Sequence, residues 1–420
     1  MILTEEEKKM LGGDFGPGVS RAMSFLVEYG EAFGAQKMIK VNSSHILPDP
    51  VEWLDTLTEG VDTFKTMTTI HAGSPYNTDL ADTLGLREGE GGFAVEQNKI
   101  ALDTYRAKGA FLTCSCAPYL MGNIVKQGNV FTWAGSSGII INNSLNGGRG
   151  NRESGVSMTC SAITGRTPDM LLTTDEGRKA QLVFSPKGLD LDAMSEADYG
   201  AMGYHIGSIA VEKNIALHTL PPSIPFEKLK YLLSPMPVSG AVSMCHITGI
   251  TPEAATLDQA LDGRKPEETF SVELKDIKAT AAQLSTAKND DVDVVMLGCP
   301  HLTIIEIREI AQLLTGKKIS ASVQLWINTN EGVYVLAKRM GYIDILEKAG
   351  AIILREICIA MFPFGKLSKN MSNVATNSAR CAHYMVRGGM GDIVGQKVMG
   401  SMYGSVKQCI NAAISGKWEA

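Results

Sequence analysis

The chain has 420 residues, of which 44% are hydrophobic and 20% are charged, and its formal net charge at pH 7 is −6. These values are ordinary for a soluble globular protein, but the length is too great for one hydrophobic core, so two or three subdomains are expected. The acidic balance argues against a nucleic-acid partner, which requires a basic patch, and no apolar run reaches the roughly 20 residues that span a bilayer.

The N-terminus and the cysteine content predict a cytoplasmic protein. The first residues include Glu5, Glu6 and Glu7, and no long apolar stretch follows them, so they do not resemble a secretory signal peptide. Eight cysteines in a chain of this length, without such a signal, are not a disulfide framework. Both observations favour a reducing compartment.

The N-terminal third alternates predicted helices and strands. Helices are predicted over residues 5–11, 19–33 and 93–108, and strands over 37–41, 66–70 and 110–113. Ser44 and His45 belong to a polar cluster after the first strand, and His71 follows the second. The third strand leads into Cys114 and Cys116. Polar side chains are therefore expected at the ends of these strands.

A glycine-rich segment over residues 135–155 forms the centre of the sequence. It contains a predicted apolar strand over 138–141, followed by amide, glycine and arginine residues, which indicates backbone that another group approaches closely. The N–H groups of 147–152, with the guanidinium groups of Arg149 and Arg152, can cradle a carboxylate or phosphate of a small substrate. A glycine-rich turn with solvated arginines is the alternative. The segment matches neither a nucleotide P-loop nor the dinucleotide fingerprint.

Three α/β regions are predicted, over residues 1–185, 186–285 and 286–420, and the charged stretch 261–268 marks one boundary. In the third region, strands are predicted over 292–297, 319–327 and 351–354, with a helix that Thr303 and Glu306 start by a capping box. Right-handed crossovers make these strands parallel, so Cys299 and Cys358 fall on one sheet edge. Asn377 and Ser378 cap a further helix.

Cys116, Cys299 and Cys358 each follow an apolar run that predicts a strand. Thiolates are natural ligands of iron–sulfur clusters, and ligands gather beyond the carboxyl ends of parallel strands. Three thiols without a fourth suggest a cluster with one open iron, which acts as a Lewis acid on a substrate hydroxyl. A buried core position is the alternative for each cysteine, and zinc is the rival metal.

His45, His71 and His301 all lie at predicted strand ends near polar residues. A role in the site and a hydrogen-bonded surface position are both open for each of them.

Several motifs distributed nearly from end to end resemble one family. The stretches that carry the resemblance are Cys116–Leu120, Asn143–Ser144, Asn151–Arg152, Ile250–Ala254, Gly298–His301, Ala375–Ser378 and Ala382–Tyr384. With them the chain resembles the large catalytic subunit of the aconitase X family, which includes phosphomevalonate dehydratase and cis-3-hydroxy-L-proline dehydratase large subunits. The resemblance implies an aconitase-like α/β fold, with several subdomains and parallel sheets around a central cleft.

The resemblance also implies a hydro-lyase that removes water from a small hydroxy acid, such as mevalonate 5-phosphate or cis-3-hydroxy-L-proline. Cys116, Cys299 and Cys358 occupy the family's metal-ligand positions, with Cys114 as the substitute for the first. A [4Fe–4S] cluster is the first expectation, and [2Fe–2S] or mononuclear iron are the alternatives. The expected partner is a small swivelling subunit that carries the base serine, because the chain stops at 420 residues without such a domain.

The same resemblance assigns the remaining site residues. The expected catalytic residues are Ser44, His45, Tyr119 and Ser378. The expected substrate-binding residues are Thr69, His71, Asn143, Ser144, Arg149, Asn151, Arg152 and Asn377. Two positions depart from the family pattern: Gly135 replaces an expected glutamate, and His71 replaces the asparagine of archaeal members. Both departures bear on the identity of the substrate.

Two further functions are open on the sequence alone. One is a non-catalytic, iron-responsive protein that binds RNA, which the acidic charge disfavours. The other is a zinc- or thiol-dependent hydrolase, for which no water-activating triad is identifiable.

Overall fold

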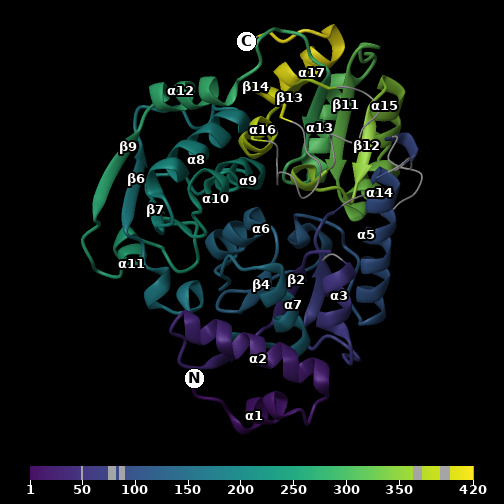
Figure 1. Ribbon diagram of the computed structural model, residues 1–420. Coiled ribbons are helices and arrows are strands. Elements are labelled where there is room, and N and C mark those ends of the chain that lie inside the picture. Colours follow the sequence, from purple (N-terminus) through teal and green to yellow (C-terminus); the bar gives the residue numbers. More distant parts are fainter. Residues whose placement is uncertain (49–50, 74–81, 85–89, 363–370, 388–397, 420) are drawn as a thin grey trace.

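The computed structural model describes residues 1–48, 51–73, 82–84, 90–362, 371–387 and 398–419 (Figure 1). Three parallel β-sheets and one antiparallel ribbon organise these residues, and helices pack against the sheets. The N-terminal helices lie at one end of the molecule and the C-terminal sheet lies at the other (Figure 1).

The N-terminal region contains a three-stranded parallel sheet with the order β3-β2-β4. Its elements are α1 (Glu5–Gly12), α2 (Pro17–Ala32), β1 (Met38–Lys40), β2 (Ser43–Ile46), α3 (Val51–Thr58), β3 (Met67–Ile70), α5 (Glu90–Ala107), β4 (Phe131–Trp133), α6 (Ser136–Ile141), α7 (Gly155–Thr164) and β5 (Arg166–Pro168). β1 lies outside this sheet and pairs antiparallel with β5. The predicted helices of this region are confirmed.

Two strand predictions in this region are wrong, and three strands, β2, β4 and β5, are not predicted. Residues 110–113 form only a single bridge, between Phe111 and Thr69. Residues 138–141 belong to helix α6, which is buried on all sides and therefore shows no helical periodicity of apolar residues. Residues 43–45, predicted as a polar strand end, belong to the central strand β2. Its polar side chains can be buried because the hydroxyls of Ser43 and Ser44 form hydrogen bonds there.

The middle region contains a four-stranded parallel sheet with the order β8-β7-β6-β9. Its elements are β6 (Leu182–Pro186), α8 (Glu196–Ala210), β7 (Ile215–Leu217), α9 (Phe226–Leu233), α10 (Met236–Gly240), β8 (Cys245–Ile247), α11 (Leu257–Leu261), β9 (Glu268–Val272) and α12 (Leu274–Leu284). Its core also includes Ile140 and Ile141 of α6 and Ala382 of the C-terminal region. One apolar core therefore joins all three regions.

The C-terminal region contains a five-stranded parallel sheet with the order β12-β11-β10-β13-β14. Its elements are β10 (Val294–Leu297), α13 (Ile304–Leu314), β11 (Gln324–Thr329), α14 (Glu331–Arg339), α15 (Tyr342–Ala349), β12 (Ile352–Arg355), β13 (Asn373–Thr376), α16 (Ala379–Val386), β14 (Gly400–Tyr403) and α17 (Val406–Ser415). The three predicted parallel strands exist, but the second begins at Gln324, so residues 319–323 are wrongly predicted as strand. The capping box of Thr303 and Glu306 and the Ser378 cap of α16 are confirmed.

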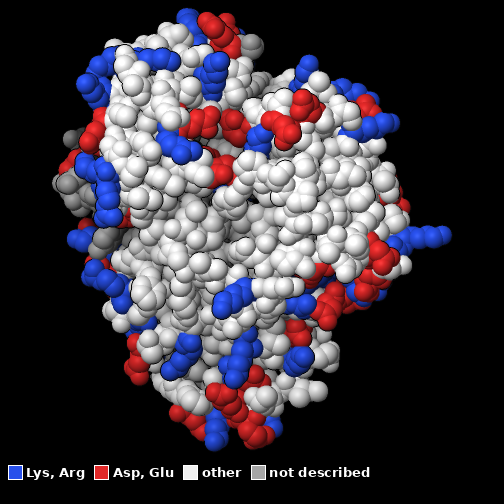
Figure 2. Space-filling view, turned by 180° about the vertical axis from the view of Figure 1, so that it is seen from behind, with Lys and Arg blue, Asp and Glu red and all other residues white. Residues whose placement is uncertain are grey.

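On the face shown in Figure 2, charged side chains of both signs lie mostly around the periphery, and uncharged side chains make up much of the hollowed centre. Among the described helices, none combines the length and the apolarity that crossing a membrane requires.

Candidate active site

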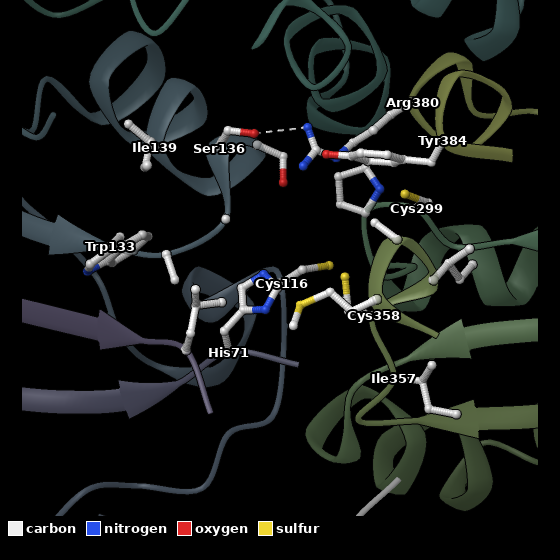
Figure 3. Close-up of a pocket in the computed structure, with 18 of the residues that line it drawn as sticks. His71, Cys116, Trp133, Ser136, Ile139, Cys299, Ile357, Cys358, Arg380 and Tyr384 are labelled. Carbon is white, nitrogen blue, oxygen red and sulfur yellow. Dashed lines mark hydrogen bonds between the residues drawn. The ribbon is translucent and has the colours of Figure 1, made fainter. Parts of the chain in front are cut away.

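One cavity of about 200 Å³ lies between the N-terminal and C-terminal sheets (Figure 3). Cys116, Cys299 and Cys358 all line it, although 183 residues separate the first two in the chain. Cys299 follows β10, Cys358 follows β12, and Cys116 lies in the loop before a short 3-10 turn, Pro118–Met121. The three thiols therefore line one cavity, while their convergence on a single metal centre stays a prediction.

The environment of the three thiols keeps them protonated in the absence of a cation. Burial, and to a smaller extent the neighbouring Cys358 and Cys299, raise the pKa of Cys116 to about 12. Burial raises the pKa of Cys299 to about 11, while the positive charge of Arg380 opposes the increase. Among the described residues, no three His, Cys, Asp or Glu side chains have the spacing of a closed metal site.

His301 ties the segments that carry the cysteines to one another. Its backbone N–H donates to the Cys116 sulfur at 3.3 Å, and its Nε2 lies 2.9 Å from the carbonyl oxygen of Ile357, next to Cys358. Because that carbonyl only accepts, Nε2 carries the proton, and Nδ1 accepts from the Ser115 hydroxyl at 3.1 Å. His301 is fully buried, so the surface position that the sequence left open is wrong for it.

Arg380 places a positive charge in the same cavity. Arg380 is only 9% exposed, and its Nη1 donates to the Ser136 hydroxyl at 3.1 Å and to the Ser234 carbonyl at 3.3 Å. The guanidinium lies over the ring of Tyr384, 5.1 Å from its centroid (Figure 3). In the described part of the chain it has no carboxylate partner within ion-pair distance. A buried, unpaired guanidinium beside a cavity is suited to bind an anionic ligand group.

Arg380 is not among the predicted site residues, but the sequence contains a signal for it. The residue stands in the first turn of α16, two positions after the Ser378 cap. A cation at a helix N-terminus opposes the helix dipole, so an arginine there is unfavourable for the helix itself. Its presence indicates a role outside the helix.

His71 lines the cavity as a neutral imidazole whose Nε2 can accept a hydrogen bond. Its Nδ1 lies 2.7 Å from the Ala72 carbonyl oxygen, so Nδ1 carries the proton and Nε2 presents a lone pair. Burial lowers its pKa to about 4, which keeps the ring neutral at physiological pH. A Cβ built on Gly135 lies 2.7 Å from Nε2. The His71 ring therefore occupies the space that a side chain at position 135 requires.

The other predicted residues of β2 and β3 lie behind His71 and do not line the cavity. His45 is fully buried, and its Nδ1 is 2.8 Å from the Thr69 hydroxyl, while its ring centroid is 5.5 Å from that of His71. The Ser44 hydroxyl contacts the Thr132 hydroxyl at 3.0 Å. These side chains support the strand that carries His71.

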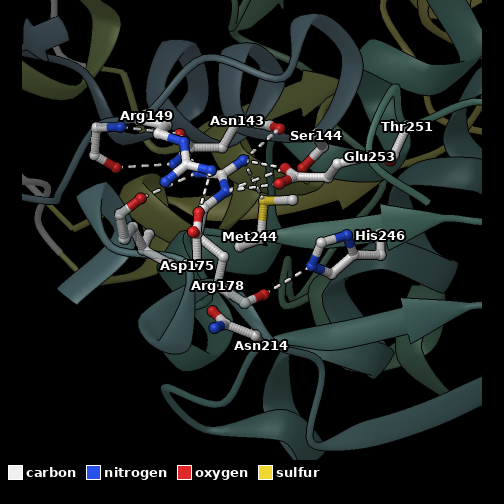
Figure 4. Close-up of polar contacts among 12 residues, drawn as sticks. Asn143, Ser144, Arg149, Asp175, Arg178, Asn214, Met244, His246, Thr251 and Glu253 are labelled. Carbon is white, nitrogen blue, oxygen red and sulfur yellow. Dashed lines mark hydrogen bonds and ion pairs between the residues drawn. The ribbon is translucent and has the colours of Figure 1, made fainter. Parts of the chain in front are cut away.

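Four of the predicted substrate-binding residues belong to a separate polar network or flank it (Figure 4). Arg149 pairs with Asp175, and Asn143 donates to the carbonyls of Gly150 and Ser243 at 2.8 and 2.9 Å. The Ser144 hydroxyl accepts from the Cys245 N–H at 3.0 Å, and Asn151 donates to the Met170 carbonyl at 3.1 Å.

Arg178 stands at the centre of this network, where it pairs with Glu253 and donates to the backbone of Asn143. The network fastens the glycine-rich segment to the middle region. Of the predicted anion-binding arginines, Arg152 lines the cavity and Arg149 does not.

The remaining predicted residues lie around the cavity without lining it. The ring of Tyr119 packs against Phe226, with centroids 5.7 Å apart, and its buried hydroxyl has no hydrogen-bond partner among the described residues. Asn377 donates to the Tyr231 hydroxyl at 2.9 Å. The Ser378 hydroxyl donates to the Cys299 carbonyl. Ser378 thus positions the segment that carries a cavity thiol.

Known proteins share the whole of this architecture. Models of the first, second and third domains of aconitase X match residues 1–176, 180–282 and 292–415. The phosphomevalonate dehydratase large subunit of Methanocaldococcus jannaschii is 32% identical to this chain, over 92% of this chain and 95% of its own length. The phosphomevalonate dehydratase large subunit of Methanothermobacter thermautotrophicus is 33% identical, over 92% of this chain and 94% of its own length. The cis-3-hydroxy-L-proline dehydratase of Hypocrea jecorina is 28% identical over 99% of this chain and 69% of its own length.

A solved structure supports the fold directly. The holo-form of Thermococcus kodakaraensis aconitase X superposes with a TM-score of 0.84 at 29% identity, over 98% of this chain and all of that one. The expected aconitase-like α/β fold is confirmed. Since three successive domain models cover most of its length and its relatives are dehydratases, the chain belongs to the aconitase X family and is an enzyme of the dehydratase class.

Proposed function

We propose that this chain is the large subunit of a two-subunit dehydratase that removes water from a small hydroxy acid. The relatives of nearly equal length are named large subunits, which supports a separate small subunit that completes the site. Mevalonate 5-phosphate and cis-3-hydroxy-L-proline are the two substrates that the relatives' names support.

The metal centre of the proposed enzyme is held by Cys116, Cys299 and Cys358. Three thiols from separate loops on one cavity are a suitable donor set for an iron or iron–sulfur centre. When bound, such a centre supplies a Lewis acid for the hydroxyl that leaves. Its binding requires the thiols to lose their protons, and the charge of Arg380 favours the thiolate form of all three.

The other cavity groups bind and orient the substrate. Arg380 anchors the carboxylate of the hydroxy acid through its two-pronged guanidinium, with the Ser136 hydroxyl beside it. The open Nε2 of His71 accepts a hydrogen bond from the substrate hydroxyl. A base from the small subunit takes the proton from carbon, and closure of that subunit excludes water from the site.

The observation that carries this proposal is that three distant thiols line one cavity with a buried arginine that has no carboxylate partner in the described ranges. The test is anaerobic reconstitution of the complex with iron and sulfide, followed by iron analysis and assays of both substrates. The Cys299→Ser variant is expected to lose iron and to lose more activity than the roughly 10–100-fold that changes in outer-shell partners cost.

A control is Cys245→Ala, because Cys245 is also buried but lies in β8, away from the cavity. It is expected to keep both iron and activity. Failure of the wild-type complex to take up iron, or equal iron content in the Cys299→Ser variant, contradicts the proposal.

A further inference from the structure

A carboxyl group that the mechanism above leaves without a role lines the same cavity. Glu153 stands beside Arg152 in the cavity wall, immediately before Ser154, which caps helix α7. We propose that Glu153 selects the charge of the substrate: it holds a proton and donates a hydrogen bond to a second anionic group of the substrate, next to Arg152. This inference rests on the proposed function and narrows its substrate class to hydroxy acids with two anionic groups.

The surroundings of Glu153 do not support a charged carboxylate. The residue is partly exposed through its other atoms, but both carboxyl oxygens are buried and neither has a hydrogen-bond partner among the described residues. The Ser157 hydroxyl, which donates to the Ser154 carbonyl at 3.0 Å, lies close enough to oppose part of the rise that burial causes in the pKa of Glu153. An unpaired buried carboxylate is costly, and a buried carboxyl avoids that cost by keeping its proton.

The charged and titratable groups near Glu153 are consistent with a neutral carboxyl. They are Tyr29 from α2, the adjacent Arg152, and His71, Arg380 and Tyr384 across the cavity. Burial raises the pKa of Glu153 to about 7, and it also raises the pKa of Tyr29 to about 12, with a smaller contribution from Glu153. Glu153 therefore changes its protonation state in the neutral pH range.

Arg380, which is buried, and Arg152, which is exposed, have no ion-pair partner among the described residues and provide two anchoring points for anions. Arg380 stacks on Tyr384, and Arg152 is close enough to the same tyrosine to lower its pKa. With the substrate carboxylate on Arg380, a second anion can reach Arg152. A protonated Glu153 donates a hydrogen bond to that anion, whereas an ionised Glu153 repels it. A substrate with an ammonium group at the same place binds better to the ionised form of Glu153, because the positive charge stabilises the carboxylate.

The inference predicts that binding of a doubly anionic ligand is coupled to proton uptake. The protonated form binds, so the affinity is fully present below the pKa of Glu153 and is lost as the pH rises above about 7. The dissociation constant of mevalonate 5-phosphate for the iron-loaded complex is expected to rise by about tenfold per pH unit between pH 7.5 and 9.

The experiment is calorimetric titration of the iron-loaded complex with mevalonate 5-phosphate, in buffers of different ionisation enthalpy, between pH 6 and 9. The Glu153→Gln variant keeps an N–H donor but cannot ionise, so it is expected to bind without proton uptake and with little pH dependence. The phosphate of the ligand also ionises, with a second pKa of about 6, and the pH dependence that remains in the Glu153→Gln variant measures this contribution. Glu268→Gln, an exposed carboxylate on the edge strand β9, is the matched control and is expected to behave as wild type.

The outcomes separate the two proposals. An active complex whose Glu153→Gln variant keeps the wild-type pH dependence overturns this inference alone. The same holds if wild type binds cis-3-hydroxy-L-proline with release of protons and does not bind the phosphate. Failure of the complex to bind or dehydrate either compound overturns the proposed function and this inference with it.

Discussion

Single residues set the electrostatics of the cavity, and Arg380 contributes its buried positive charge. A buried cation without an anionic partner is unfavourable unless a ligand supplies the missing charge. The hydrogen bonds to Ser136 and Ser234 and the ring of Tyr384 hold the guanidinium in place but do not neutralise it. The charge of Arg380 also lowers the pKa of the three thiols that face it. One residue thus prepares the cavity for both an anion and a metal.

The substitution Arg380→Lys tests this role, because it keeps the charge and removes the planar fork. A bidentate contact to a carboxylate is worth about 1.5–3 kcal/mol, so kcat/KM is expected to fall by roughly 10–100-fold. Arg149→Lys is the control, since Arg149 pairs with Asp175 away from the cavity, and it is expected to keep kcat/KM within about twofold. Equal losses in the two variants place the anion anchor in the glycine-rich segment and contradict this assignment.

At the scale of elements, the sequence predicts best where local signals and burial agree. In the C-terminal region, continuous apolar runs mark strands that are covered on both faces, and the capping box of Thr303 and Glu306 marks the start of α13. The parallel arrangement follows from the connections, so the shared edge of Cys299 and Cys358 is predictable. The position of Cys116 opposite these two cysteines is not predictable, because it depends on how two separate sheets pack against each other.

Helix α6 shows why other elements are not predictable from the local pattern. Its run of isoleucines has the composition of a strand, and burial on all sides removes the polar face that indicates a helix. The turn from β4 into α6 depends on Gly135, whose φ of +81° is a left-handed conformation. The reason for glycine at this position is the His71 ring, which only the folded structure reveals.

The substitution Gly135→Ala tests this contact at the start of α6. The left-handed backbone alone costs a β-carbon about 1–2 kcal/mol, and the clash with His71 Nε2 at 2.7 Å adds to that cost. Gly34→Ala is the control, because Gly34 has a similar φ of +75° and open space around it. Denaturant unfolding is expected to show a larger loss for Gly135→Ala, and the double variant with His71→Ala is expected to recover the difference. Equal losses for the two glycines contradict a steric role of His71.

At the scale of the whole molecule, the cavity exists only because the regions are locked together, and a buried ion pair joins two of them. Lys230 of α9 is fully buried, and its ammonium contacts the carboxylate of Glu306 on α13 and the His301 carbonyl at 3.2 Å. His301 in turn donates to the Cys116 sulfur. The middle region therefore contacts the backbone that positions the thiols.

Removal of one partner of this pair leaves the other as an uncompensated buried charge. The substitution Lys230→Met is expected to destabilise the protein by about 3–5 kcal/mol, measured as a lower unfolding midpoint in urea, and the double variant with Glu306→Gln is expected to regain much of the loss. The control, Lys417→Met, breaks the exposed pair with Asp291 and is expected to leave the midpoint unchanged.

Since Lys230 also holds the His301 carbonyl, Lys230→Met is expected to reduce iron uptake at temperatures where the protein remains folded. A Lys230→Met protein with the stability and iron content of the Lys417→Met protein shows that apolar packing alone fixes the cavity.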